Sequence, residues 1–95
     1  MDFLPLPADA RPRLSPHYVF RWEESQSAFI LLYPEGLIKL NASAGAILAR
    51  CDGARTLATI IAELQASYPA QGAEIADGVR AFVDLACDKG WLRAA

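Results

Sequence analysis

The sequence lacks the residue sets on which most enzymes and metalloproteins depend. Its 95 residues include a single histidine, His17, and two cysteines, Cys51 and Cys87. His17 has no serine or cysteine partner at a recognisable spacing, which favours a surface or hydrogen-bonded histidine over a catalytic base. Both cysteines fall on apolar helical faces, where a free thiol is usually a small core residue. A redox or metal role for them stays open as the less favoured interpretation.

Signals for nucleotides, metals and nucleic acids are equally scarce. The six glycines form neither a GxGxxG nor a GxxxxGK[ST] loop. Asp84 and Asp88 lie one helical turn apart and could hold a proton or a metal, but no further ligand is suggested nearby, so a solvated helix face is favoured. The net charge of −2 provides no basic excess to neutralise phosphates. We therefore expect no catalytic site, no metal and no cofactor.

Long hydrophobic runs are absent as well. The longest, Ala28–Tyr33, has six residues, whereas a membrane span needs about 20. Residues 1–10 contain no basic residue and are broken by Pro5 and Pro7, unlike a secretory signal. We expect a cytoplasmic protein without a membrane segment. With 54% hydrophobic and 21% charged residues, the chain is too apolar for a disordered protein and suits one small domain.

Periodicity divides the chain into a tail and a domain. Residues 1–16 hold four of the six prolines and no periodic pattern, which predicts an extended or mobile tail before a domain over residues 17–95. Residues 17–23 alternate like a strand with one buried face, and residues 28–33 are apolar on both faces, as in a central strand. The turn Tyr33-Pro34-Glu35-Gly36 leads into a third strand. These segments predict a three-stranded antiparallel sheet.

After residue 41 the spacing of apolar residues becomes helical and predicts three helices. The third runs from about residue 73 to residue 89, and Trp91 and Leu92 are expected to fold back behind it as a closing strand or clamp. Such an order is an α+β fold close to a winged helix-turn-helix, with the helices on one face of the sheet. The residues that cap or end the helices are Asn41, Gly53, Thr56, Pro69 and Gly90.

The short third strand is the best candidate for a binding surface. A turn leads into it and a helix follows it, so it is expected to be an exposed edge to which a partner peptide can add one strand. Lys39 on this edge can discourage self-pairing, and it can also meet an acidic side chain of a ligand. The two roles are compatible.

DNA binding is the main structural alternative, because winged helices often bind DNA. The third helix would have to enter the major groove, which requires a basic face. A generic protein-interaction module with a different client is the other alternative. The composition of the third helix argues against DNA binding, since the helix carries more acidic than basic residues: Glu74, Asp77, Asp84 and Asp88 against Arg80 and Lys89.

A set of turn, cap and apolar motifs occurs in a characteristic order along the chain, within a match of roughly residues 11–92. The motifs are Arg11-Pro12-Arg13, Tyr33-Pro34-Glu35-Gly36, Leu40-Asn41, Ala44, Ile47-Leu48, Cys51-Asp52-Gly53, Thr56 and Ile60. This combination resembles the PqqD family, small proteins of pyrroloquinoline quinone biosynthesis that belong with the peptide-recognition domains of ribosomally made, modified peptides. Each motif alone is a common turn or cap, so the specificity lies in the combined spacing. Relatives fused to other peptide-modifying enzymes are similar, and the free-standing length favours PqqD.

The resemblance implies binding rather than catalysis. Such proteins bind the precursor peptide PqqA and present it to PqqE, a radical S-adenosylmethionine enzyme that cross-links a Glu and a Tyr of that peptide. The peptide resembles an extra strand beside the third strand, in a cleft whose other wall is the third helix. Phe82 and Val83 are most simply core residues, since a helix stripe usually is core, although residues that flank such a stripe can still line a groove. The implied site comprises Leu37, Ile38, Lys39, Leu40, Val79, Phe82, Val83 and Ala86.

Two short connections, residues 52–55 and residues 69–72, join elements that must pack together. If either connection straightens, the same helix-to-sheet contacts can form between two chains. The sequence therefore predicts a domain-swapped homodimer at high protein concentration, favoured by mass action. The functional state can still be a monomer, because the third strand must stay open for a ligand.

Overall fold

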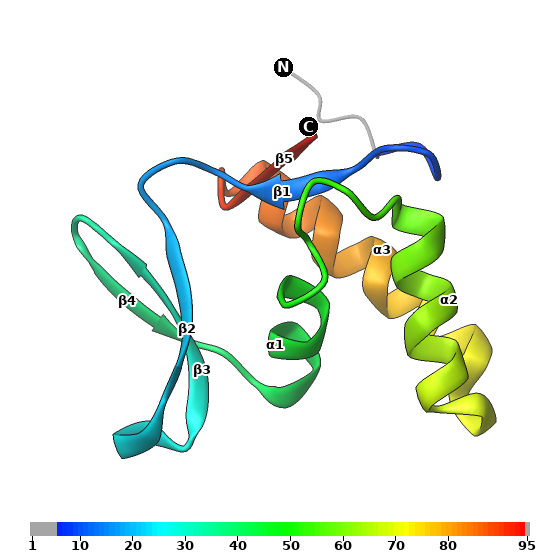
Figure 1. Ribbon diagram of the computed structural model, residues 1–95, viewed down its shortest axis with the longest axis horizontal. Helices are drawn as coiled ribbons and strands as arrows, with labels where there is room; N and C mark the ends of the chain where they lie inside the picture. Colours follow the sequence, from blue (N-terminus) through cyan, green and yellow to red (C-terminus); the bar gives the residue numbers. More distant parts are fainter. Residues whose placement is uncertain (1–5, 95) are drawn as a thin grey trace.

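The fold consists of a three-stranded sheet that stands beside a group of three helices, with a small two-stranded sheet near the chain ends (Figure 1). It is taken from a computed structural model that describes residues 6–94. This architecture confirms the predicted α+β, winged-helix-like fold. The elements are β1 (Pro12–Leu14), β2 (Val19–Glu23), β3 (Ala28–Tyr33), β4 (Gly36–Lys39), α1 (Ala42–Leu48), α2 (Leu57–Ser67), α3 (Gly72–Asp88) and β5 (Leu92–Ala94), with short 3-10 turns at Glu24–Gln26 and Pro69–Gln71.

The larger sheet is antiparallel in the order β2-β3-β4, as predicted. Strand β3 is central because it is apolar on both faces: Ile30 is 1% exposed and Leu31 is fully buried. Strand β4 follows β3 through a two-residue turn, so that Tyr33 lies opposite Gly36. Strand β2 is less buried than the alternation of its residues predicted. Trp22, near its end, stays 47% exposed beside the ring of Phe29.

Local signals set most of the helix ends, as the sequence predicted, but Gly53 does not end α1, which stops at Leu48 with Ala49 as its C-cap. The side-chain oxygen of Asn41 accepts a hydrogen bond from the N–H of Ala44 at 2.8 Å, which caps α1. Thr56 caps α2 in the same way through the N–H of Thr59, at 3.1 Å. Gly90 has a φ of 82° just after α3, in the left-handed region that glycine adopts most easily.

Helix α1 attaches the helices to the sheet. Gly45 of α1 lies so close to Phe29 of β3 that a Cβ on Gly45 would be only 2.7 Å from a ring carbon. The main core then extends from the sheet through all three helices. Its buried members include Leu31 and Leu40 from the sheet side and Ile47, Leu48, Ile60, Leu64, Val79, Val83 and Ala86 from the helices.

The expected N-terminal tail requires a correction, because part of it belongs to the domain. Strand β1 pairs antiparallel with β5, and Pro12 is among the fully buried residues. The N–H of Ser15 also donates to the carbonyl of Trp91 at 2.8 Å, so the two chain ends are tied together. The expected closing strand after α3 is confirmed, and it begins at Leu92. Residues 1–5 of the expected tail lie outside the described residues.

Candidate functional site

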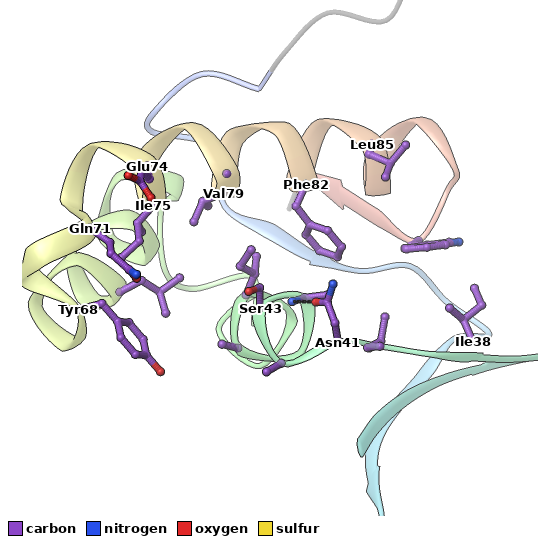
Figure 2. Close-up of a pocket in the computed structure, with 18 of the residues that line it drawn as sticks. Ile38, Asn41, Ser43, Tyr68, Gln71, Glu74, Ile75, Val79, Phe82 and Leu85 are labelled. Carbon is purple, nitrogen blue, oxygen red and sulfur yellow. Dashed lines mark hydrogen bonds between the residues drawn. The ribbon is translucent and has the colours of Figure 1, made fainter. Parts of the chain in front are cut away.

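An open groove of about 760 Å³ lies between α3 and the chain that leads from β4 into α1 (Figure 2). Helix α3 forms one wall, and the Phe82 side chain points from it toward Asn41 at the start of α1. The first turns of α1 form the facing wall. The corner between α2 and α3 closes one end, where Tyr68 and Gln71 line it. The groove therefore extends well past the end of the strand.

The groove contains most of the site that the sequence resemblance implied. Five of the eight expected residues line it: Ile38, Lys39, Leu40, Val79 and Phe82. Leu37 does not line it, and its side chain stays 55% exposed.

Val83 and Ala86 require a correction. Both have 0% exposure and belong to the core cluster beneath the groove. Neither residue is part of the groove lining. The reason is the helical period: residues 79, 83 and 86 form the stripe that α3 packs against the core, and the groove takes only Val79 from it and otherwise uses the neighbouring stripe.

Apart from Phe82, sequence reasoning missed the residues that the groove takes from this neighbouring stripe and from distant turns. The stripe comprises Ile75, Gly78, Phe82 and Leu85, at spacings of three and four residues. Its signal was present, since α3 has more apolar residues than one core face needs and Leu85 remains 48% exposed. The other missed lining residues had no sequence signal: Asn41, Ala42, Ser43, Ala44, Ala46, Ile47, Leu64, Tyr68, Gln71, Glu74 and Trp91.

Strand β4 offers an unpaired backbone edge beside the groove. The N–H of Leu40 donates to the carbonyl of Phe29 at 2.9 Å, so these two residues form a hydrogen-bonded pair. Hydrogen-bonded and non-hydrogen-bonded pairs alternate along an antiparallel ladder. Ile38, opposite Leu31, therefore bonds to β3, whereas the N–H and C=O groups of Leu37 and Lys39 point away from it. In residues 6–94 no other strand pairs with this edge.

The groove is mainly apolar, with one charge of each sign. Lys39 and Glu74 are its charged lining residues, and Glu74 lies on the first turn of α3, toward the α2–α3 corner (Figure 2). At the opposite end the rings of Phe82 and Trp91 are 6.5 Å apart, and the Lys89 ammonium lies 5.9 Å from the centre of the Trp91 ring. These features suit a mostly apolar, extended ligand.

The two cysteines lie outside the groove lining. Burial raises the pKa of the Cys51 thiol to about 12, with smaller contributions from Cys87 and Asp52, and burial also raises the pKa of Cys87. These thiols stay protonated at neutral pH, which makes them poor nucleophiles and metal ligands. His17 is exposed. Among residues 6–94, no group of three His, Cys, Asp or Glu side chains is placed to hold a metal ion, and no helix is long and apolar enough to cross a membrane.

Comparisons with known proteins show which family the chain belongs to. Residues 28–92 match the family model of coenzyme PQQ synthesis protein D (PqqD). A PqqA binding protein of Stutzerimonas stutzeri is 49% identical over 74 residues, which are 77% of this chain and 78% of the relative. A PqqA binding protein of Methylococcus capsulatus is 42% identical over 88 residues, 93% of this chain and 92% of the relative.

A solved structure shares the whole fold. It is the solution NMR structure of the PqqD truncation of Methylobacterium extorquens PqqCD, reported as a functional, stand-alone recognition element for ribosomally synthesized and post-translationally modified peptides. It aligns with a TM-score of 0.77 at 27% identity and covers 96% of both chains. The chain therefore belongs to the PqqD family of coenzyme PQQ synthesis proteins.

Proposed function

We propose that this chain is a peptide chaperone that binds the precursor peptide PqqA as an added strand on β4 and holds it against α3. The observation that carries the proposal is the open edge of β4, which lies along one side of the groove. Relatives that cover most of the chain bear the name PqqA binding protein, which supports the identity of the ligand.

Strand addition divides affinity and selectivity between backbone and side chains. The N–H and C=O groups of Leu37 and Lys39 supply up to four main-chain hydrogen bonds to a peptide, whatever its sequence. The apolar lining at Ile38, Phe82 and Leu85 then selects for peptides whose side chains fill it. An acidic side chain of the peptide can pair with Lys39.

A pair of exposed apolar residues tests the groove with little risk to the fold. Leu85 lines the groove and is 48% exposed, whereas Val19 lies outside its lining and is 53% exposed. Completing the burial of Leu85 against a peptide is worth about 1 kcal/mol, roughly half of a full burial, so Leu85→Ala should weaken PqqA binding about fivefold. Calorimetric titration should show no change for the control, Val19→Ala. Equal affinity of both variants and the parent would place the peptide elsewhere.

The proposal extends to the role of the complex. The chain holds PqqA near PqqE and contributes no catalytic residue, because tethering alone can supply an effective peptide concentration in the mM range. Cross-linking of PqqA by PqqE should therefore be faster and more complete when this chain is added. Equal rate and yield with and without the chain would refute the presenting role.

We also propose a homodimer at high concentration, formed by exchange across one of the two connections. The first connection is firmly held: the Asp52 carboxylate accepts backbone hydrogen bonds from Ala54 and Arg55, and the Arg55 guanidinium bonds to both Asp52 and Glu63. The connection at residues 69–72 makes fewer hydrogen bonds and is therefore the better hinge. Sedimentation over a hundredfold concentration range should show a dimer at the upper end. A single monomeric species throughout would exclude it.

A further inference from the structure

Gly78 occupies the interior of α3 without a local structural reason. A glycine inside a helix is unfavourable compared with alanine, because its backbone loses more freedom on folding. Gly78 is not among the glycines with a positive φ, so the conformation of the helix does not require glycine. A Cβ built on Gly78 meets no atom within 4 Å, so packing within the domain does not require it either.

Gly45 is an example of a glycine that packing does require. A Cβ on Gly45 would lie 2.7 Å from Phe29, so that glycine permits the contact of α1 with the sheet. At Gly78 the missing side chain leaves open space instead, and Gly78 lines the groove. Its neighbours on the same face are Glu74, one turn before it, and Phe82, one turn after it.

We propose that the space over Gly78 is a subsite that receives one large apolar side chain of the bound peptide, such as Leu, Met, Phe, Tyr or Trp. This inference rests on the proposed function. The lining next to Gly78 favours an apolar occupant, because Ile75, Val79 and Phe82 present only carbon atoms. A charged side chain placed among them would lose its water without gaining a partner. Glu74 is exposed and can keep its own hydration.

The subsite can be blocked without disturbing the fold. Gly78→Leu fills the space over the helix, whereas Gly78→Ala adds one methyl group and leaves most of it open. Ala81→Leu is the matched control, because Ala81 is an exposed residue of the same helix outside the groove lining. In calorimetric titration with PqqA, Gly78→Leu should bind at least about tenfold more weakly than the parent, since apolar pockets discriminate side-chain size at this level. Ala81→Leu should bind as the parent does, and Gly78→Ala should fall between the parent and Gly78→Leu.

Peptide variants identify the occupant. Each large apolar residue of PqqA is replaced by alanine in turn, and every variant is titrated against the parent chain and against Gly78→Leu. At one peptide position, replacement by alanine should weaken binding to the parent about tenfold but should hardly change binding to Gly78→Leu. Such coupling is expected of two groups that share one site. Circular dichroism checks folding, and Gly78→Met fills the same space if the leucine variant unfolds.

The possible outcomes distinguish failure of the subsite from failure of the proposed function. If the parent chain does not bind PqqA, the proposed function and this inference both fail. If the parent binds PqqA and loses it on blocking the β4 edge, yet Gly78→Leu binds equally well, only the subsite is refuted. Absence of any peptide position coupled to Gly78 would refute it as well.

Discussion

Proline at Lys39 should weaken peptide binding while the sheet stays intact. The N–H of Lys39 points away from β3, so its removal costs no hydrogen bond within the sheet. Proline at Ile38 should behave in the opposite way, because the N–H of Ile38 bonds to Leu31 and its loss breaks the ladder between β3 and β4. Proline at these two adjacent positions therefore distinguishes a loss of peptide binding from a loss of the fold.

The expected size of the effect follows from the number of hydrogen bonds removed. One lost hydrogen bond costs about 0.5–1.5 kcal/mol, so Lys39→Pro should raise the Kd for PqqA about 2- to 13-fold relative to Lys39→Ala. Lys39→Ala is the proper reference because it removes the same charge and keeps the N–H. The double variant Leu37→Pro/Lys39→Pro removes both outward donors and should raise the Kd about 5- to 160-fold relative to the double alanine variant.

Calorimetric titration with PqqA measures these Kd values, and thermal unfolding by circular dichroism checks the fold. Folded proline variants that bind as tightly as their alanine counterparts would refute strand addition at β4. A loss of affinity that appears already in Lys39→Ala and does not grow in Lys39→Pro would show that the charge of Lys39, not the backbone edge, holds the peptide.

Three further predictions concern the fold. Asn41→Ala removes the cap of α1 and should lower the free energy of unfolding in urea by about 1 kcal/mol; no change would mean that the cap bond contributes nothing. Gly45→Ala forces a methyl group against Phe29 and should destabilise by about 1–3 kcal/mol, whereas Gly78→Ala should stabilise by about 0.5–1 kcal/mol; equal effects would contradict the packing difference. Burial raises the pKa of Cys51 from 9.0 to about 12. As the pH rises, the thiol therefore loses its proton in the unfolded chain before it does so in the folded chain. The stability of the fold should thus be unaffected by this thiol below pH 9 and should decline above pH 9. Between pH 8 and pH 10 the parent should lose about 1.4 kcal/mol more than Cys51→Ala, and parallel pH profiles would contradict the burial of the thiol.

The elements that could be predicted from the sequence are those with local causes. Asn41 and Thr56 cap helices through residues three positions away, and Gly90 ends α3 through its own φ. The order β2-β3-β4 followed from alternation and from the short turn at Pro34, because neighbouring strands joined by tight turns pair with each other.

The pairing of β1 with β5 could not be predicted in the same way. Each strand has three residues, and the two lie at opposite ends of the chain. No periodicity can be recognised in so short a segment, and the prolines around residue 12 indicate a tail. Pro12 is nonetheless compatible with a strand, because it occupies the first position of β1, where proline is tolerated.

The candidate site was predictable along β4 and only partly along α3. The turn and the cap define the edge strand locally, but apolar residues on α3 occupy two adjacent stripes. Which stripe faces the core depends on how α2 packs against α3, and this contact is not encoded in the pattern of α3 alone. The sequence therefore gave no reason to separate Val83, which is buried, from Phe82, which lines the groove.

Strand addition at β4 can be observed by amide hydrogen exchange of the chain, measured by NMR with and without PqqA. In the free chain the amide of Ile38 should already be protected, because it bonds to β3, whereas those of Leu37 and Lys39 should exchange freely. Addition of PqqA should slow exchange at Leu37 and Lys39 and leave Ile38 little changed. If PqqA binds while the exchange of Leu37 and Lys39 stays fast, the peptide does not add to β4 and the account is wrong.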